Sequence, residues 1–319
     1  MLIPSQFRTT TPLADLSVRY ANALEDYAAL KLFPARLVDK SAFSFYIAKL
    51  DNLRVQDPTA PSGTEAPSGE YQYTTASAST KEYAWKGLIL DRDKTNADAA
   101  VADLETAQAM HNMDILMLHL EIAAATKAQT SGNYPAALTA ASGNWGTAGT
   151  DVFSEFDTAK EAVKDSCLKQ ANMCVLNKKA LRTLARHPDV VDRVKYTSQA
   201  SAKALAAALS DLFELEFVIA DARKNTANKG ATDAISRVWG AHAVIAHVNP
   251  AQGLKTMTYG STFFAQSAGL YTKTIEKPEL GRGQGARELE SGWEFSVEAV
   301  AQDSTGDFSA GYLLTTVYS

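Results

Sequence analysis

Histidine is the side chain best suited to acid–base chemistry or metal binding near neutral pH, and this chain has five. His111 and His119 stand eight residues apart on a predicted helix, with Glu121 beside them. Helical zinc sites place two histidines four residues apart, as in HExxH, so this spacing does not match a metal site. We interpret both histidines as part of a solvated or partly buried helix face.

The remaining histidines favour structural roles. His242 and His247 are five residues apart in a strand pattern, so their side chains point to opposite faces and cannot grip one ion together. His187 comes directly before Pro188 at the end of a predicted helix, where a positive charge interacts favourably with the helix dipole. Neither arrangement predicts catalysis.

Motifs for nucleophilic catalysis and phosphate binding are missing. Cys167 and Cys174 show no CxxC or cysteine–histidine spacing, and the sequence contains no GxSxG. We interpret both cysteines as small buried hydrophobic residues. The sequence GRGQGA at Gly281–Ala286 departs from GxGxxG and lacks a surrounding strand–turn–helix unit, so it favours a flexible loop.

Acidic pairs such as Glu155/Asp157 and Asp91/Asp93 are typical of any solvated surface. We therefore assign no catalytic, cofactor-binding or metal-binding residue and expect no cofactor. An α+β enzyme with an unrecognised site stays open as an alternative, and it would need a pocket of perturbed ionisable groups.

The bulk properties fit a folded, soluble protein of a reducing compartment. The 319 residues are 46% hydrophobic and 21% charged, enough for a sizeable core. A net charge of −5 gives no electrostatic case for a nucleic-acid-binding surface. No apolar run approaches the roughly 20 residues that span a membrane, and the start MLIPSQFRTTTP lacks the regions of a signal peptide.

Two aromatic strands flank a long polar segment near the N-terminus. Residues 1–31 favour an arm that ends in a short helix. Phe43, Phe45 and Ile47 then alternate with smaller residues, and "KEYAWKGLIL" (81–90) repeats the strand pattern. Some thirty residues rich in Pro, Ser, Thr and Gly lie between the two strands. The segment is either a disordered linker or a protruding hairpin that orders on another subunit, and the flanking strands favour the hairpin.

The rest of the chain predicts a mixed fold without βαβ regularity. A long helix is expected at residues 93–127, with further helices at 152–169, 178–186 and 201–212. Strands are expected at 173–176, 213–219, 243–248 and 293–299, and "GYLLTTVY" closes the chain. The predicted class is α+β.

The segment "NMCVLNKKALRTLARHPDVVDRVKY" (172–196) predicts a strand, a basic amphipathic helix, a stop at His187-Pro188 and a short helical turn. We expect this corner to be part of a scaffold. Our hypothesis is that its charged side chains take part in contacts within or between subunits, although an ordinary surface charge contributes only ~0–1 kcal/mol. These side chains are Arg182, Arg186, Asp189, Asp192 and Arg193.

The same segment resembles a strand–helix element of the major capsid proteins of tailed bacteriophages, which have the Hong Kong 97-type fold. "LFELEFVIADARKNTANKG" (212–230), "VWGAHAVIAHVNP" (238–250) and "TYGSTF" (258–263) are similar to strands and turns of the same family. The resemblance covers roughly residues 170–265, and the order of the remaining parts agrees with it. Ala171 departs from the family pattern, which often has proline there. We also expect that no cleavable scaffolding domain precedes the arm.

The resemblance implies a fold built from five segments: an N-terminal arm (1–40), an extended β-hairpin loop (41–91), a peripheral domain with a long spine helix (92–200), an axial domain (201–285) and closing peripheral strands (286–319). The axial domain would meet its copies near the centres of pentamers and hexamers, and the extended loop would lie across a neighbouring subunit. Some relatives form lysine–asparagine cross-links, but Lys49, Lys81 and Lys86 near the loop match no pattern that identifies one.

The function that the resemblance implies is a phage head protein made in the bacterial host cytoplasm. It would form an icosahedral shell around double-stranded DNA without sequence-specific binding, and it would have no membrane partner. Scaffolding, portal and decoration proteins are further expected partners, with scaffolding either a separate protein or dispensable. An encapsulin-like shell that encloses cargo enzymes is the closest alternative.

Overall fold

The computed structural model describes residues 22–49, 52, 54–63, 65–91, 104–194, 202–251, 256–266, 270–280, 285–300 and 309–318. Most of the expected arm, the first part of the expected long helix and most of the GRGQGA loop lie outside these residues.

One sheet is organised around a single long strand. β13 (Ala286–Glu298) pairs along one edge with β4 (Lys81–Leu90), and along the other with β12 (Tyr271–Lys277) and then β11 (Ser261–Ala265). β1 (Ala35–Val38) adds a parallel edge strand beside β11. The sequence predicted only the last part of β13, because the first half lacks a clear alternation of apolar and polar residues.

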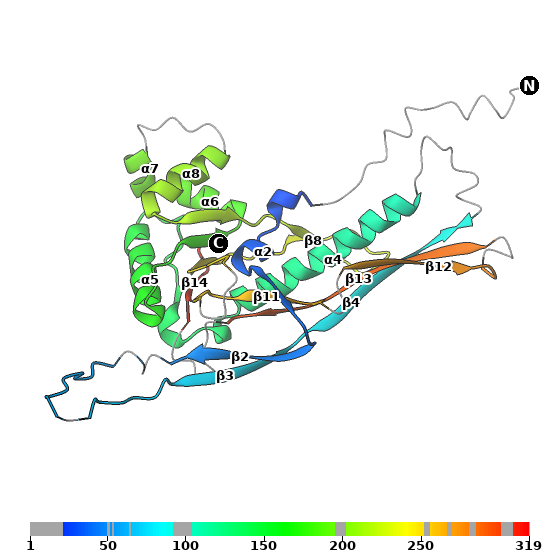
Figure 1. Ribbon diagram of the computed structural model, residues 1–319. Coiled ribbons are helices and arrows are strands. Elements are labelled where there is room, and N and C mark those ends of the chain that lie inside the picture. The colour runs from blue at the N-terminus through cyan, green and yellow to red at the C-terminus, as the bar shows by residue number, and fades with distance from the viewer. Residues whose placement is uncertain are drawn as a thin grey trace, which may run out of the picture.

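The spine helix α4 (Leu104–Gln129) lies along this sheet (Figure 1). Its 26 residues correspond to a length of about 39 Å. Buried Asn112 donates from Nδ2 to the carbonyl of Leu289 at 3.0 Å, and the His119 ring lies 4.5 Å from that of Tyr83. The expected long helix is therefore confirmed over the described residues.

A second sheet has the order β5-β14-β10-β6-β7. Its strands are β5 (Thr139–Ala141), β14 (Gly311–Thr315), β10 (Ala243–Ala246), β6 (Met173–Leu176) and β7 (Glu216–Ile219). All residues of β6 and β10 are buried, as expected for central strands covered on both faces.

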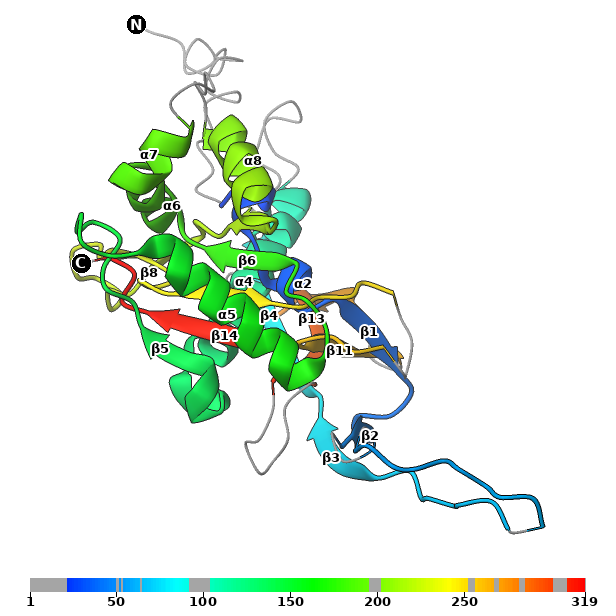
Figure 2. The same cartoon turned by 90° about the vertical axis from the view of Figure 1, so that its left-hand side faces the viewer.

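Four helices pack around the second sheet: α5 (Val152–Cys167), α6 (Lys178–Ala185), α7 (Pro188–Val194) and α8 (Ala202–Phe213). α5 runs across one face of the sheet (Figure 2). The three helices α6, α7 and α8 connect β6 to β7, which pair in parallel. These segments form a βαβ crossover among the described residues, where no regular βαβ arrangement was expected.

The second sheet draws its strands from segments that the sequence analysis placed in different units. β6 comes from residues 92–200, β7 and β10 from 201–285, and β14 from 286–319. The expected boundaries at 200 and 285 are therefore not boundaries between sheets.

The expected strand at 213–219 is shorter than the apolar alternation indicated. Phe213 ends α8, Glu214 has a left-handed backbone with φ 56°, and the strand begins only at Glu216. Phe213 and Leu215 are nevertheless both buried, because the end of a helix and a turn can bury alternate residues as a strand does.

Short elements complete the fold. The helical turns η2 (Leu24–Asp26) and α2 (Ala29–Leu32) precede β1, and η4 (Ser131–Asn133) and η5 (Ala136–Leu138) follow the spine helix. β8 (Arg223–Asn225) and β9 (Ile235–Arg237) form a small separate hairpin.

Buried Glu121 ties three of these parts together. Its two carboxylate oxygens accept hydrogen bonds at 2.9 Å from the backbone N–H groups of Ala28 and Ala29 at the start of α2. One of the oxygens also accepts from the indole N–H of Trp239 at 2.5 Å. Glu121 therefore supplies the helix cap that the side chain of Ala28 cannot.

Candidate assembly surfaces

A β-hairpin projects from the body of the molecule (Figure 1). β2 (Ala42–Ala48) pairs with β3 (Tyr73–Ser79) in antiparallel register from Ala42↔Ser79 to Ala48↔Tyr73. Beyond the strands, the side-chain amide of Asn52 exchanges hydrogen bonds of 2.7 and 2.6 Å with the backbone of Gln72. All described residues of the tip, 54–63 and 65–72, are exposed.

The expected hairpin is confirmed, but its strand pairing is a correction. β2 was expected to pair with residues 81–90, which instead form β4 and pair with β13. The true partner, β3, has the sequence YTTASAS and was read as part of the polar linker. Its low hydrophobicity concealed it, because a two-stranded ribbon buries only one face and needs few large apolar side chains.

The root of the hairpin is fixed to the body by aromatic and polar contacts. The rings of Phe43 and Phe45 lie 4.5 and 5.9 Å from that of Phe263 on β11. Thr80, between β3 and β4, donates its N–H to the carbonyl of Ser41 at 2.8 Å, and its hydroxyl donates to the Glu294 carboxylate. The hairpin therefore leaves the body in a defined direction, although all described residues of its tip are exposed.

The outer part of the hairpin exposes apolar side chains. Tyr46 and Tyr73 are 69% and 54% exposed, and their rings meet edge to face with centroids 4.9 Å apart. Tyr71 and Val55 nearby are also exposed. Exposed apolar groups that gather on one projection are typical of a surface that another molecule covers. Trp85 on β4 is exposed as well.

A groove of about 990 Å³ lies where the hairpin root meets the spine helix and β13. Half-buried Tyr83 and buried Phe295 form an apolar part of its lining, with the His119 ring beside them. Partial burial lowers the pKa of His119, which favours its neutral form. Lys81 and Lys127 are the cations that line the groove, and the Lys127 amine lies 2.9 Å from the carboxylate of Glu298.

The corner at residues 172–194 has the predicted strand, helix and stop. Asn177 caps α6 by accepting the N–H of Ala180 at 2.8 Å, and its amide donates to the carbonyl of Gly240 at 2.6 Å. His187 is 1% exposed, and its Nε2 lies 3.3 Å from the carbonyl of Thr147. The structural role expected of His187 is confirmed, but the ring packs inside the corner and does not stand at an open helix end.

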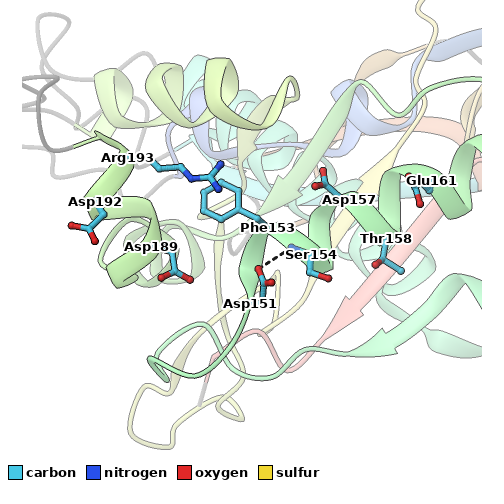
Figure 3. Close-up of a pocket in the computed structure, with 9 residues that line it drawn as sticks. All are labelled: Asp151, Phe153, Ser154, Asp157, Thr158, Glu161, Asp189, Asp192 and Arg193. Atoms are coloured by element: carbon cyan, nitrogen blue, oxygen red, sulfur yellow. Dashed lines mark hydrogen bonds between the residues drawn. The ribbon is translucent and has the colours of Figure 1, made fainter.

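A second groove of about 720 Å³ lies between α5 and α7 (Figure 3). Its floor is the ring of Phe153, and the Arg193 guanidinium carbon lies 3.7 Å from the ring centroid. Three of the five charged residues singled out in the sequence, Asp189, Asp192 and Arg193, line this groove together. The other two, Arg182 and Arg186, are exposed on α6.

The other candidates for chemistry are dispersed. Burial raises the pKa of both Cys167 and Cys174 well away from thiolate reactivity. Glu155, expected to be a solvated surface acid, instead accepts hydrogen bonds from Gly143 N and the Trp145 indole, at 2.8 and 2.9 Å. Lys86 pairs with Glu288 at 2.9 Å.

Among the residues that the structure describes, no group of three or more histidine, cysteine or acidic side chains is placed to hold a metal ion. No helix among the same residues is long and apolar enough to cross a membrane.

Comparison with known proteins points to phage heads. No family model matches the chain. The major capsid protein of Burkholderia phage BcepMu is 25% identical over 187 residues, which span 56% of this chain and 59% of that protein. A phage-related protein from Bordetella bronchiseptica superposes with a TM-score of 0.69 at 21% identity, over 93% of this chain and 94% of the other.

The capsid of cyanophage P-SCSP1u superposes with a TM-score of 0.58 at 13% identity, over 98% of each chain. The chain has the Hong Kong 97-type capsid fold. The hairpin β2–β3 and the strand β4 fall within the expected extended loop 41–91, and α4 falls where the long helix was expected. The SrpI encapsulin of Synechococcus elongatus, with a TM-score of 0.56 at 11% identity over 97% of this chain and 95% of the other, shares the architecture.

Proposed function

We propose that this chain is the major capsid protein of a tailed bacteriophage, a structural protein without catalytic activity. Copies would assemble through pentamers and hexamers into an icosahedral head that encloses double-stranded DNA. The similarity to the BcepMu major capsid protein supports this role, as does a fold shared with phage capsids over nearly the whole chain.

The single observation that carries the proposal is the projecting hairpin. It is anchored at its root by Phe263, Thr80 and Glu294, yet its outer part exposes Tyr46 and Tyr73 to solvent. A two-stranded ribbon is marginally stable alone, and a neighbouring copy that covers these apolar side chains would stabilise it. We therefore propose that the outer part of the expected extended loop 41–91, residues 46–73, lies across the adjacent subunit, whereas its last strand, β4, stays paired with β13 in the body of its own subunit.

Residues 201–285 would lie near the centres of pentamers and hexamers as the axial domain. Residues 1–40, 92–200 and 286–319 would supply the arm and the peripheral domain. Scaffolding, portal and decoration proteins are the proposed partners, synthesis in the host cytoplasm precedes assembly, and the virion is the proposed location.

Removing the tip tests this function. Residues 55–70 are replaced by a short Gly-Ser turn, which keeps β2, β3 and the root contacts. We expect the variant to fold with an unchanged circular dichroism spectrum but to form no closed particles in negative-stain electron microscopy. A matched control replaces the exposed residues 168–170, which lie outside the hairpin and outside residues 201–285, by Gly-Ser-Gly and is expected to leave assembly intact. Closed particles from the tip variant in wild-type yield would refute the role given to the hairpin.

An encapsulin-like shell is the second candidate, because the SrpI encapsulin superposes nearly as well as the cyanophage capsid. The contents of particles purified from the native host distinguish the two. Packaged double-stranded DNA supports the phage head, and a single enriched cargo protein without DNA supports the compartment.

A further inference from the structure

One side of α6 is basic. Its apolar residues face the second sheet and are buried, whereas Lys179, Arg182 and Arg186 are exposed, with Lys178 half-buried beside them. Lys179 lies over the ring of Tyr318, 4.4 Å from its centroid. Within the part of the chain that the structure describes, Arg182 and Arg186 form no ion pair. Two neighbouring guanidinium groups, one helical turn apart, are therefore unpartnered.

The groove between α5 and α7 has the opposite charge (Figure 3). It is lined by five carboxylates and one guanidinium, which gives a net charge of −4 when all are ionised. The lining residues are Asp151, Phe153, Ser154, Asp157, Thr158, Glu161, Asp189, Asp192 and Arg193. Its walls belong to two helices that face each other across the ring of Phe153, so the groove is a concave surface with an apolar floor.

Contacts within the subunit neutralise only part of this charge. Asp157 pairs with Lys160 at 3.1 Å, and the guanidinium of Arg193 covers Phe153. Asp151 accepts the N–H of Ser154 at 3.0 Å and so caps α5. The Asp189 carboxylate lies 3.7 Å from Nδ1 of buried His187. Asp189 and Glu161 are nevertheless exposed on opposite walls, where they can receive a further cation.

We propose that the basic side of α6 in one copy docks against the acidic groove between α5 and α7 in the next copy of a capsomer ring, with Arg182 and Arg186 facing Asp189 and Glu161. This inference rests on the proposed function. A closed ring of identical subunits needs a heterologous interface, in which two different surfaces of the same chain meet. Two complementary surfaces on neighbouring helices provide such a pair, and they fix the order in which copies follow one another.

DNA is a less suitable occupant of the basic side. Asp189 follows Arg186 by three residues, so a duplex that lay along α6 would bring its phosphates toward the acidic groove. The whole chain also carries a net charge of −5, which disfavours a nonspecific attraction for polyanions.

Charge reversal tests the proposal on the full chain. One variant carries Arg182→Glu and Arg186→Glu, a second carries Asp189→Arg and Glu161→Arg, and a third combines all four substitutions. We expect each double variant to lower the yield of particles or rings at least about tenfold and the fourfold variant to restore it, because the combination recreates the charge pairing. A matched control, Lys164→Glu with Lys169→Glu, makes the same change on exposed residues outside both surfaces and is expected to assemble normally.

Mixing the two double variants gives a readout that misfolding cannot imitate. One variant is acidic on both surfaces. The other keeps its basic α6 and carries two arginines in the groove, whose net charge rises from −4 to 0. Each double variant therefore mismatches its own copies, and the two fit together only in alternation. Alternation closes in a ring of six and fails in a ring of five. We therefore expect the mixture to form six-membered rings or hexagonal sheets, whereas neither variant alone assembles.

Three results would overturn the proposal. The first is that the double variants assemble as the wild type does, and the second is that the fourfold variant and the mixture both fail to recover assembly. The third is that the Arg182/Arg186 variant assembles normally but loses affinity for DNA, which would assign the basic side to nucleic acid. If the wild type itself never assembles, the proposed function fails, and this outcome is distinct from all three.

Discussion

A single buried carboxylate connects three parts of the chain. Glu121 lies in the middle of the spine helix, and three N–H groups from α2 and Trp239 donate to it. A carboxylate suits this position because both of its oxygens accept hydrogen bonds, whereas an amide presents an acceptor on one side and a donor on the other. The geometry thus explains why an acidic residue stands in an otherwise apolar stretch of the spine helix.

Replacing Glu121 by glutamine tests this account. In Glu121→Gln the amide NH₂ faces an N–H donor, so one buried donor loses its partner. We expect the free energy of unfolding to fall by about 1–3 kcal/mol, measured as a shift in the midpoint of chemical denaturation. The control Glu276→Gln removes an exposed charge and should shift the midpoint little. Equal shifts of the denaturation midpoint for the two substitutions would contradict the role of Glu121 as acceptor for the three N–H groups.

The difference in the free energy of unfolding between the wild type and Glu121→Gln depends on pH with a definite sign. Burial is the largest influence on Glu121 and raises its pKa, although the three N–H donors and Lys31 act in the opposite direction. When the pKa is raised in the folded state, Glu121 makes its full contribution to the free energy of unfolding below its pKa in the unfolded chain. That contribution declines as the pH rises through the pKa in the folded state. The stability gap between wild type and Glu121→Gln should therefore narrow from pH 4 to pH 8. A gap that widens would show that the hydrogen bonds outweigh burial.

The hairpin shows what patterns reveal at the scale of elements and what they miss. The alternation of Phe43, Phe45 and Ile47 predicted β2 because these side chains are at least half-buried on one face. β3 escaped prediction because it contributes threonine, serine and alanine, whose signal is weak. The pairing of β4 with β13 also escaped, since nothing local specifies a partner two hundred residues away.

The aromatic root of the hairpin supports a prediction at this scale. Phe263→Ala removes the ring against which Phe43 and Phe45 pack, and buried phenylalanine-to-alanine changes cost about 3–5 kcal/mol. We expect hydrogen exchange to accelerate at residues 42–48 and 73–79 more than in the second sheet. The control Phe217→Ala opens a comparable cavity beside the second sheet. In Phe217→Ala, hydrogen exchange should accelerate more in the second sheet than in the hairpin. Similar exchange patterns in the two variants would contradict an anchoring role for Phe263.

The corner at residues 172–194 was the best predicted part of the candidate surfaces. Proline after His187, a buried apolar run and a basic helix are local signals, and each appears in the structure. The acidic groove was not predictable, because its two walls come from α5 and α7, which are separated along the chain by β6 and α6 and meet only in the folded chain. Asp189, Asp192 and Arg193 were predicted from the sequence as contact residues, but no local pattern indicates that Glu161 and Asp157 face them.

At the scale of the whole molecule, buried residues of the two sheets and of the helix α4 belong to one hydrophobic core. α4 lies on the first sheet, and Trp239, which bonds to Glu121 on α4, lies in the segment that leads into β10 of the second. The hairpin extends from the first sheet, and the acidic groove and basic helix belong to the second. Surfaces suited to neighbouring copies are therefore spread over both parts of the subunit, as an assembly with several different interfaces requires.

Negative-stain electron microscopy of the purified full chain, with light-scattering mass on the same sample, tests the central claim most directly. We predict closed particles, or rings of five and six subunits, whose mass is a large multiple of the 34.3 kDa chain. The measurement should cover a range of protein concentrations and include polyethylene glycol as a crowding agent, which favours assembly without a scaffold. A single species of one or two chains under every condition would contradict the assignment of this protein as a shell subunit.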